Sequence, residues 1–336
     1  MTINVTVLGL GRLGGSLARR LVAQDPLTVA GYDRDNGLAQ QAQRQGALHK
    51  AHLNLLQAVE QADLVFLTGP LSEQYESLRL IAPELRAGCV TATVGPLLGP
   101  PLAWAAEAGF AAAGRGERHF IACHPALNPS QLYAGETGFE SASPDLFERG
   151  LWALAPAPGC SPDAARLVGE VVRRLGAFAY FMDPAEHDGL VGASEALPAM
   201  LAMGLMQAAA SSPGWPETQK IADRALATAT VALVEADPAA LRANRESALR
   251  YLDVALGALQ ALRQQLAAGE TALVEEALAQ AVARRAAWLA DRERGDWERL
   301  GEAQAKLPTA GDVLGRFLVG GWLSKRADEA MGSEAK

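Results

Sequence analysis

Short apolar runs alternate with longer amphipathic stretches through the first half of the chain. The apolar runs are rich in β-branched residues, which favour strands, and the stretches between them have helical spacing. The predicted strands are residues 3–8, 27–32, 64–68, 90–94, 120–123, 152–155 and 177–182, and the clearest predicted helices are 14–23, 72–85 and 162–174. Strands that alternate with helices predict βαβ units, and hence a mostly parallel α/β sheet with helices on both faces.

The pattern changes at about Pro184, after which Ala, Leu, Glu and Arg dominate and no strand is predicted. Apolar residues recur at helical spacing within 226–234 and 249–262. Asp237-Pro238 predicts the start of a further helix, because proline is tolerated in the first turn of a helix and breaks its interior. The second part of the chain is therefore predicted to be all-helical.

We place the domain boundary between residues 1–183 and residues 184–336. The helical region has wider apolar faces than a lone bundle of its size must bury, which predicts a homodimer formed through this region. Residues 313–322 form a short amphipathic segment near the end of the chain. We expect this segment to dock on the protein's own surface or on the dimer partner, and binding to a membrane surface is the alternative.

Composition narrows the choice of partners and location. The chain has 336 residues, of which 49% are hydrophobic, and this is enough for two domains with buried cores. A net charge of -8 without a basic cluster argues against a nucleic-acid partner. The three cysteines lie far apart, so neither a disulfide framework nor a metal site is expected. Without a signal-peptide pattern or an apolar run of about 18 residues, we expect a cytoplasmic protein with no membrane span.

A glycine-rich stretch, LGLGRLGGSLA, follows the first predicted strand and opens the first predicted helix. In such a loop Gly9 allows a tight turn, Gly11 lets the backbone approach a pyrophosphate, and Gly14 lets helix and strand pack closely. Arg12 and Leu13 occupy the positions between these glycines, at a helix N-terminus that attracts phosphate. The loop predicts a Rossmann-type dinucleotide-binding domain.

Asp33 ends the second predicted strand, 24 residues after Gly9. A carboxylate in that place accepts hydrogen bonds from an adenosine ribose, and it repels a 2′-phosphate. This favours NAD as the cofactor. Arg34, the next residue, keeps NADP as the alternative.

Four stretches together resemble the prephenate and arogenate dehydrogenase family of tyrosine biosynthesis. They are the glycine loop, ADLVFLTGP, FIACHPALNP and FMDPAEHDGLVGASEALPAML. The resemblance covers roughly residues 3–265 and implies a small-molecule substrate and an oxidative decarboxylation. In that reaction a hydride leaves the ring carbon that bears the 4-hydroxyl, carbon dioxide is lost, and the ring becomes aromatic.

His124 matches the catalytic histidine of the family, at the end of a predicted strand. A neutral imidazole suits the removal of a hydroxyl proton because its unperturbed pKa is about 6.5. We therefore predict that His124 is the general base, and capping or packing is the alternative. For His187, which precedes Asp188 at a predicted helix start, we expect helix capping and packing between the domains. The remaining histidines are expected at the surface or in packing roles: His49, His52 and His119.

The sequence departs from the family where the family binds its substrate. Pro96 and Leu98 replace a serine and a lysine, and Ala196 and Ala199 replace two histidines. Glu195 stands in place of another serine, where a carboxylate would disfavour a dianion and attract an amino group. Arginines are expected to bind carboxylates as forks.

Arg242 matches the family's carboxylate-binding arginine, although Arg245 fits that place as well, and a solvated arginine on a helix face is the alternative for both. Three hypotheses follow from these matches and departures. The chain is a prephenate or arogenate dehydrogenase, or a nicotinamide enzyme for a less anionic substrate such as an imine or a hydroxy acid, or an NAD-binding dimer that has lost turnover.

Overall fold

A computed structural model describes residues 2–110, 118–133, 137–295 and 297. The predicted amphipathic segment at 313–322 lies outside these residues. The chain divides into two compact units, Met1–Leu289 and Ala290–Lys336. The first unit contains the sheet and nearly all of the helical region that the structure describes.

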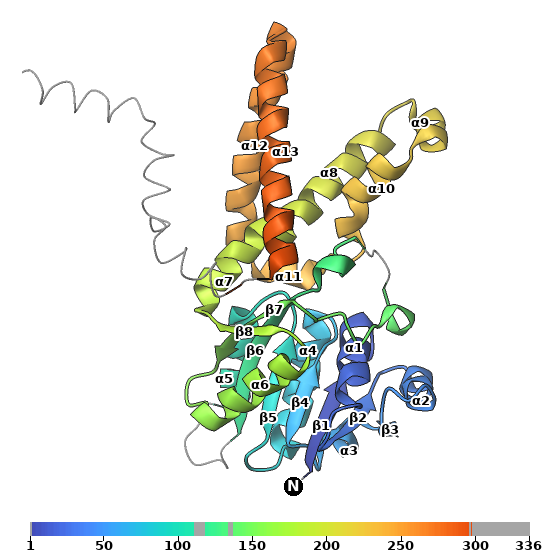
Figure 1. Ribbon diagram of the computed structural model, residues 1–336, viewed down its shortest axis with the longest axis vertical. Coiled ribbons are helices and arrows are strands. Elements are labelled where there is room, and N and C mark those ends of the chain that lie inside the picture. Colours follow the sequence, from blue (N-terminus) through green and yellow to red (C-terminus); the bar gives the residue numbers. More distant parts are fainter. Residues whose placement is uncertain (1, 111–117, 134–136, 296, 298–336) are drawn as a thin grey trace, which may run out of the picture. The chain divides into compact units, whose positions relative to one another are not determined.

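An eight-stranded sheet forms the first part of this unit (Figure 1). Its strand order is β3-β2-β1-β4-β5-β6-β7-β8, and every neighbouring pair is parallel except β6 and β7, which are antiparallel. The strands are β1 (Ile3–Leu8), β2 (Leu27–Tyr32), β3 (Lys50–His52), β4 (Leu64–Leu67), β5 (Val90–Val94), β6 (His119–Ala126), β7 (Leu151–Pro156) and β8 (Phe178–Phe181). The predicted Rossmann-type, doubly wound sheet is confirmed.

All seven predicted strands are present to within a few residues, but the prediction missed β3. This edge strand has only three residues and pairs with β2 from Ala30 to Tyr32. Three residues are too few to show a period-2 pattern in the sequence. Of the predicted helices, 162–174 is exact, whereas the helix predicted at 14–23 begins at Arg12 and the one predicted at 72–85 ends at Ile81.

Helices cover both faces of the sheet because successive side chains of a strand point to opposite faces. In β4, Phe66 packs with one face and Val65 with the other, and both are fully buried. The first face is covered by α1 (Arg12–Leu21), α2 (Asn36–Arg44) and α6 (Pro162–Arg174), and the second by α3 (Leu55–Val59), α4 (Leu71–Ile81) and α5 (Gly99–Glu107).

The strand order reverses between β1 and β4, which places a crevice outside the carboxyl ends of these strands. Thr68 follows β4 directly, and its hydroxyl donates a hydrogen bond of 2.7 Å to the carbonyl oxygen of Gly9 after β1. The ends of the two strands are therefore tied together at the place where an open α/β sheet holds its ligand.

From Pro184 onward the described residues form helices and turns only, as predicted. The elements are α7 (Pro184–Val191), a π-helical turn η4 (Gly192–Ala196), α8 (Leu197–Ala210), α9 (Trp215–Ile221), α10 (Arg224–Thr230), a 3₁₀ turn η5 (Val231–Leu233), α11 (Pro238–Ala243), α12 (Arg245–Ala268) and α13 (Thr271–Arg294). Asp237 caps α11, which confirms the predicted start at Asp237-Pro238.

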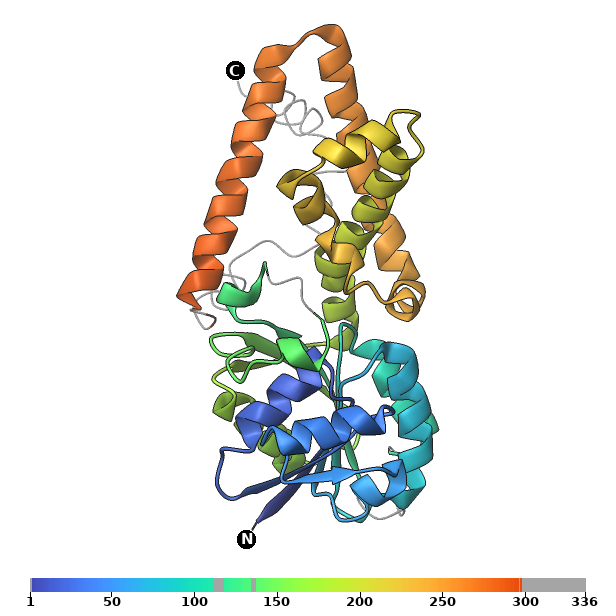
Figure 2. The ribbon, with the colours of Figure 1, turned by 90° about the vertical axis from the view of Figure 1, so that its right-hand side faces the viewer.

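Helix α12 packs against α7, η4 and α8 (Figure 2). Gly192 makes this approach possible, because a Cβ atom there would lie 2.8 Å from the Cβ of Ser247 on α12.

The continuous helical stretch Pro184–Ala210 is long and apolar enough to cross a membrane by length and composition alone. Its first turns, however, carry His187 and Asp188, whose side chains bond to the sheet region.

Candidate functional site

The glycine loop between β1 and α1 has the geometry of a phosphate cradle. Gly9 has φ +90°, a conformation that only glycine adopts readily. A Cβ atom on Gly14 would lie 1.9 Å from the carbonyl oxygen of Gly9. Beside Gly11, the N-cap of α1, an added Cβ would meet nothing within 4 Å, and no side chain caps the helix. The open helix N-terminus therefore fits the pyrophosphate of a dinucleotide.

Asp33 lies at the end of β2 beside this loop. Its Oδ2 accepts a hydrogen bond of 2.7 Å from the backbone N–H of Leu10, and its Oδ1 accepts one of 2.9 Å from that of Asp35. A carboxylate has about four lone-pair sites, so this fixed carboxylate can still accept hydrogen bonds from ribose hydroxyls. Arg34 lies next to it and is paired with two glutamates of α4.

A cavity of about 440 Å³ lies between the carboxyl ends of the strands and the helical region. Residues of the glycine loop line it, namely Gly11, Arg12 and Leu13, together with His124 from the end of β6. The helical region contributes Glu195 and residues from Ala232 to Asn244. The cavity thus brings the predicted cofactor loop and the predicted base to one place.

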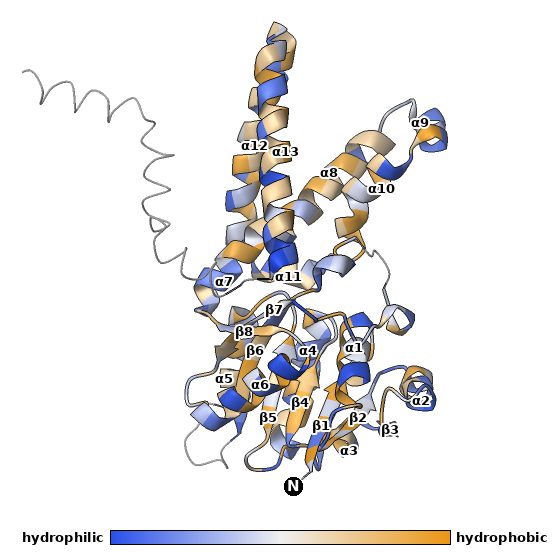
Figure 3. Cartoon of the chain, in the orientation of Figure 1, coloured by the Kyte–Doolittle hydropathy of each residue, from blue (hydrophilic) through white to orange (hydrophobic). Residues whose placement is uncertain are grey.

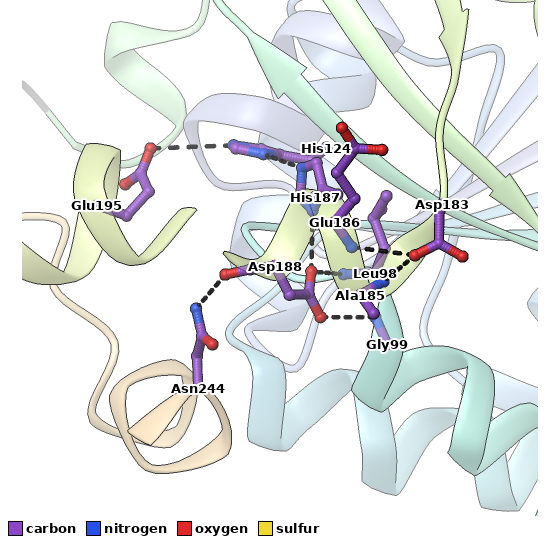
Figure 4. A network of polar contacts seen from close by, with 10 residues as sticks. All are labelled: Leu98, Gly99, His124, Asp183, Ala185, Glu186, His187, Asp188, Glu195 and Asn244. Carbon is purple, nitrogen blue, oxygen red and sulfur yellow. Dashed lines mark hydrogen bonds and ion pairs between the residues drawn. The ribbon is translucent and has the colours of Figure 1, made fainter. Parts of the chain in front are cut away.

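His124 is one end of a chain of hydrogen bonds that crosses from the sheet to the helices (Figure 4). Its Nδ1 lies 2.9 Å from Nε2 of His187, and Nδ1 of His187 lies 2.8 Å from Oδ1 of Asp188. On the other side of the ring, Nε2 of His124 lies 3.9 Å from Oε1 of Glu195. The ring is therefore held at one nitrogen while the other faces the acid that lines the cavity.

Asp188 anchors this chain at the N-terminus of α5. Its two oxygens accept hydrogen bonds of 2.8 Å from the backbone N–H groups of Leu98 and Gly99. Asn244 donates a further bond of 2.7 Å to the carbonyl oxygen of Asp188 (Figure 4). Segments that are distant in sequence thus hold Asp188 in place, and its carboxylate has the hydrogen-bond partners that a buried charge requires.

The charge states of the chain follow from these contacts. An ionised Asp188 only accepts hydrogen bonds, so Nδ1 of His187 carries a proton and Nε2 of His187 accepts one from Nδ1 of His124. Nε2 of His124 then has a free lone pair. Burial, and next the neighbouring His187, lower the pKa of His124 to about 3, although Asp188 opposes this shift. His124 is therefore neutral at pH 7.

Two glutamates give the cavity a negative character. Burial by the surrounding protein, and next the nearby Glu235, raise the pKa of Glu195 to about 7, although 53% of its side chain still faces open space. Glu235 forms an ion pair of 3.1 Å with Arg12 of the glycine loop. Among the described residues that line the cavity, Arg12 is the only arginine or lysine.

The two predicted carboxylate ligands do not lie in this cavity. Arg242 and Arg245 are both exposed and neither belongs to its lining. Pro96, Ala196 and Ala199 do line it. Leu98, which replaces the family's lysine, does not line the cavity and is fully buried in the core beside α5.

The capping role predicted for His187 is wrong. Asp183 caps α7, with its Oδ1 accepting hydrogen bonds from the backbone N–H groups of Ala185 and Glu186. His187 is 5% exposed and contacts His124 directly. Position in the sequence could not reveal this contact, because the two histidines are 63 residues apart. Glu235 was also missed, since it falls within a stretch of ordinary helix formers.

The fold and the site together define an α/β protein with a dinucleotide-binding loop that opens onto a histidine-containing cavity. Residues 17–180 match the family model for the nucleotide-binding domain of prephenate dehydrogenase. The resemblance recognised in the sequence is therefore confirmed over the sheet region, although this match begins just after the glycine loop. No curated protein sequence matches the chain significantly.

Solved structures extend the likeness to the helical region. Arogenate dehydrogenase from Synechocystis matches with a TM-score of 0.65 at 21% identity, over 85% of this chain and 100% of that one. Prephenate dehydrogenase from Aquifex aeolicus, in complex with hydroxyphenyl propionate and NAD+, matches with a TM-score of 0.71 at 19% identity, over 85% and 98%. A putative prephenate dehydrogenase from Corynebacterium glutamicum gives 0.67 at 19%, over 85% and 90%. At these identities the likeness establishes the fold.

Proposed function

We propose that this protein is a nicotinamide-dependent dehydrogenase of the prephenate and arogenate dehydrogenase type, with His124 as its general base. One observation carries the proposal: the free nitrogen of His124 faces the cavity that is also lined by the glycine loop. A proton acceptor and a dinucleotide cradle that share one cavity are what hydride transfer from a hydroxyl-bearing carbon requires.

The bound nicotinamide supplies the hydride acceptor. His124 takes the hydroxyl proton at Nε2. Its Nδ1 keeps its own proton, which forms the hydrogen bond to Nε2 of His187. Asp188 holds His187 in the tautomer that makes this possible, and the negative carboxylate stabilises positive charge that develops on the two rings. In a reaction of the prephenate type, the ring then loses carbon dioxide and becomes aromatic.

We propose NAD as the cofactor that this site prefers. The carboxylate of Asp33 is fixed at the end of β2, where it suits two ribose hydroxyls and repels a 2′-phosphate. The Aquifex aeolicus protein of similar fold was solved with NAD+, which supports the same choice.

The cavity also favours a second candidate function, the oxidation of a substrate less anionic than prephenate. Prephenate is a dianion, but the one described arginine of the lining is already paired with Glu235. Glu195 would repel a carboxylate when ionised and attract an amino group. Arogenate, which carries an amino group, fits this environment better than prephenate, and so does an imine or a hydroxy acid with a single charge.

A substrate panel tests these alternatives. Prephenate, arogenate, imines and hydroxy acids are offered with NAD+ and NADP+ or their reduced forms, and the change in nicotinamide absorbance is followed. We expect turnover with a member of the panel, and loss of a proton acceptor in His124→Gln should reduce kcat/KM by about 10²- to 10⁴-fold. His119→Gln, at the opposite end of the same strand β6, is the matched control and should retain activity.

If the wild type and His124→Gln both bind NAD+ and neither turns over any substrate, the result would instead favour an NAD-binding dimer that has lost catalysis. Failure to bind either dinucleotide would reject the proposed function altogether.

We propose further that the protein is a homodimer through its helical region. Apolar side chains of α8 and α12 face outward, including Met203 at 53% exposure and Leu259 at 52%. Hydrophobic colour continues along α8 as well as through the strands (Figure 3). Exposed apolar faces of this extent are typical of protein interfaces, and a second copy of the same chain is the commonest partner.

A further inference from the structure

Arg34 is held by two carboxylates that belong to a different element. Its NH2 group lies 2.5 Å from Oε2 of Glu76, and its NH1 group lies 3.4 Å from Oε1 of Glu73. The two glutamates are three residues apart on α4, so they lie on one face of that helix. Glu76 above all, and Glu73 next, raise the pKa of Arg34, although partial burial opposes this shift. The guanidinium of Arg34, which follows β2, is therefore paired with two carboxylates.

Helix α4 is fixed in the place that brings these glutamates to Arg34. Gln74, which is 2% exposed, lies between Glu73 and Glu76 in sequence and faces the core. Its Nε2 donates hydrogen bonds of 2.7 Å to the carbonyl oxygen of Gly69 and 2.9 Å to that of Val94. The start of α4 is thus tied to the ends of β4 and β5, beside the dinucleotide loop.

The charges around the ribose position do not favour a further anion. Asp33, Arg34 and Glu73 line one small groove next to Gly9, and Glu76 adjoins it through its pair with Arg34. Two carboxylates therefore pair with the one guanidinium of this groove, and a third, that of Asp33, lines the same groove. The side chains are exposed, at 53% for Arg34 and 62% for Glu76, so their ion pairs contribute little to folding stability. What they decide is whether the guanidinium is available to a ligand.

We propose that Glu73 and Glu76 are specificity-determining residues that select NAD over NADP by occupying the guanidinium of Arg34. An arginine directly after the acidic residue of β2 is well placed to bind a 2′-phosphate as a fork. Here the phosphate has to displace two carboxylates and approach a third, Asp33. The inference rests on the proposed function, since it concerns the dinucleotide that the glycine loop binds.

Dinucleotide binding tests the inference without knowledge of the substrate. The dissociation constants of NADH and NADPH are measured by fluorescence for the full chain, for Glu73→Gln/Glu76→Gln, and for the same double variant with Arg34→Gln added. The wild type should prefer NADH. Release of Arg34 in the double variant should tighten NADPH binding by about tenfold or more, because a hydrogen bond to a charged group is worth roughly 1.5 to 3 kcal/mol. NADH binding should change by less than about threefold.

Adding Arg34→Gln should abolish the gain in NADPH affinity, which separates a released guanidinium from a general loss of negative charge. The control Glu84→Gln/Glu107→Gln removes two carboxylates that neither line the groove nor pair with Arg34, and NADPH affinity should stay as in the wild type. An unchanged NADPH affinity in Glu73→Gln/Glu76→Gln, or a gain that persists without Arg34, would overturn the inference while NADH binding leaves the proposed function intact. Absence of binding for both dinucleotides would reject both.

Discussion

The sheet region and the helical region bury their apolar side chains to very different extents. Both hydrophobic clusters that cover the faces of the sheet are drawn from residues before Pro184. Most of the large apolar side chains that remain exposed belong to the helices after it, such as Val254 on α12 at 67% and Val282 on α13 at 60%. The sheet region therefore contains the core that stabilises this unit, whereas the helical region supplies one wall of the cavity and leaves much of its apolar surface exposed.

The two regions meet at Asp188 and His187. Their side chains connect the end of β6 and the start of α5 to the first helix of the helical region. The same contacts orient the predicted base. Docking of the helical region and orientation of the His124 ring therefore depend on the same contacts, and substitutions on either side of this junction should separate the two contributions.

Substitution within the sheet core should have the largest effect on the free energy of unfolding. Phe66 is fully buried in β4, and Phe66→Ala leaves a cavity that the neighbours cannot refill, so we expect a loss of about 3 to 5 kcal/mol in the free energy of unfolding. Denaturant unfolding followed by circular dichroism measures it. Val282→Ala on α13, which truncates a largely exposed side chain outside the proposed dimer face of α8 and α12, is the control. Equal losses for the two variants would contradict the contrast between the regions.

Substitutions at the junction formed by His187 and Asp188 should have the next largest effect on the free energy of unfolding. Asp188→Ala leaves the N–H groups of Leu98 and Gly99 and the ring of His187 without their acceptor, and each unsatisfied group costs about 1 to 3 kcal/mol. Asp183→Ala removes only the cap of α7 and should cost about 0.5 to 2 kcal/mol.

Turnover separates these two variants further. Asp188→Ala should lower kcat and change its pH profile, because the tautomers of His187 and His124 are no longer fixed, while Asp183→Ala should keep the wild-type profile. Identical pH profiles in the two variants would count against a role of this chain of hydrogen bonds in turnover.

Glu195 should give a smaller effect that depends on pH. Its pKa rises from 4.5 to about 7 on folding, so its contribution to stability is fully present below pH 4.5 and is lost as the pH rises through 7. Glu195→Gln removes this loss, so the gain in stability of the variant over the wild type should be larger at pH 8 than at pH 5. Because half of the side chain is exposed, we expect on the order of 1 kcal/mol.

Thermal unfolding from pH 4 to 9 measures this difference, with Glu186→Gln on the exposed side of α7 as the matched loss of one carboxylate. A difference of the opposite sign, with Glu195→Gln relatively less stable at pH 8, would show that the charged form of Glu195 is favoured in the folded protein.

The smallest effect on the free energy of unfolding is expected on the outer face of α12. Leu256 is 47% exposed, so Leu256→Asp should change the unfolding of a monomer by no more than about 0.5 kcal/mol. In a homodimer the same charge would be buried at the interface, and the dimer should dissociate in sedimentation or size-exclusion experiments. Arg263→Asp, a charge change at a polar position of the same helix, is the control. A protein that is monomeric before substitution would contradict the proposed dimer.

Much of the sheet region was predictable because its pattern is local. A short apolar run rich in β-branched residues marks a strand within a few residues, and the glycine spacing from Gly9 to Gly14 marks the loop, so seven strands and the position of the glycine loop followed from the sequence. The short edge strand β3 escaped because three residues carry no periodic signal. The place of Asp33 beside the loop was predictable for the same local reason, since it directly follows a strand.

The sequence by itself determined a dinucleotide loop, a doubly wound sheet and the switch to helices at Pro184, because each depends on neighbours in the chain. Only the tertiary structure decided that His187 contacts His124, that Glu235 pairs with Arg12, and that Arg242 and Arg245 lie outside the cavity. These outcomes depend on how a helix packs on the end of a sheet far away in sequence. Packing selects which face of the helix turns inward, and the hydrophobic pattern alone leaves that choice open.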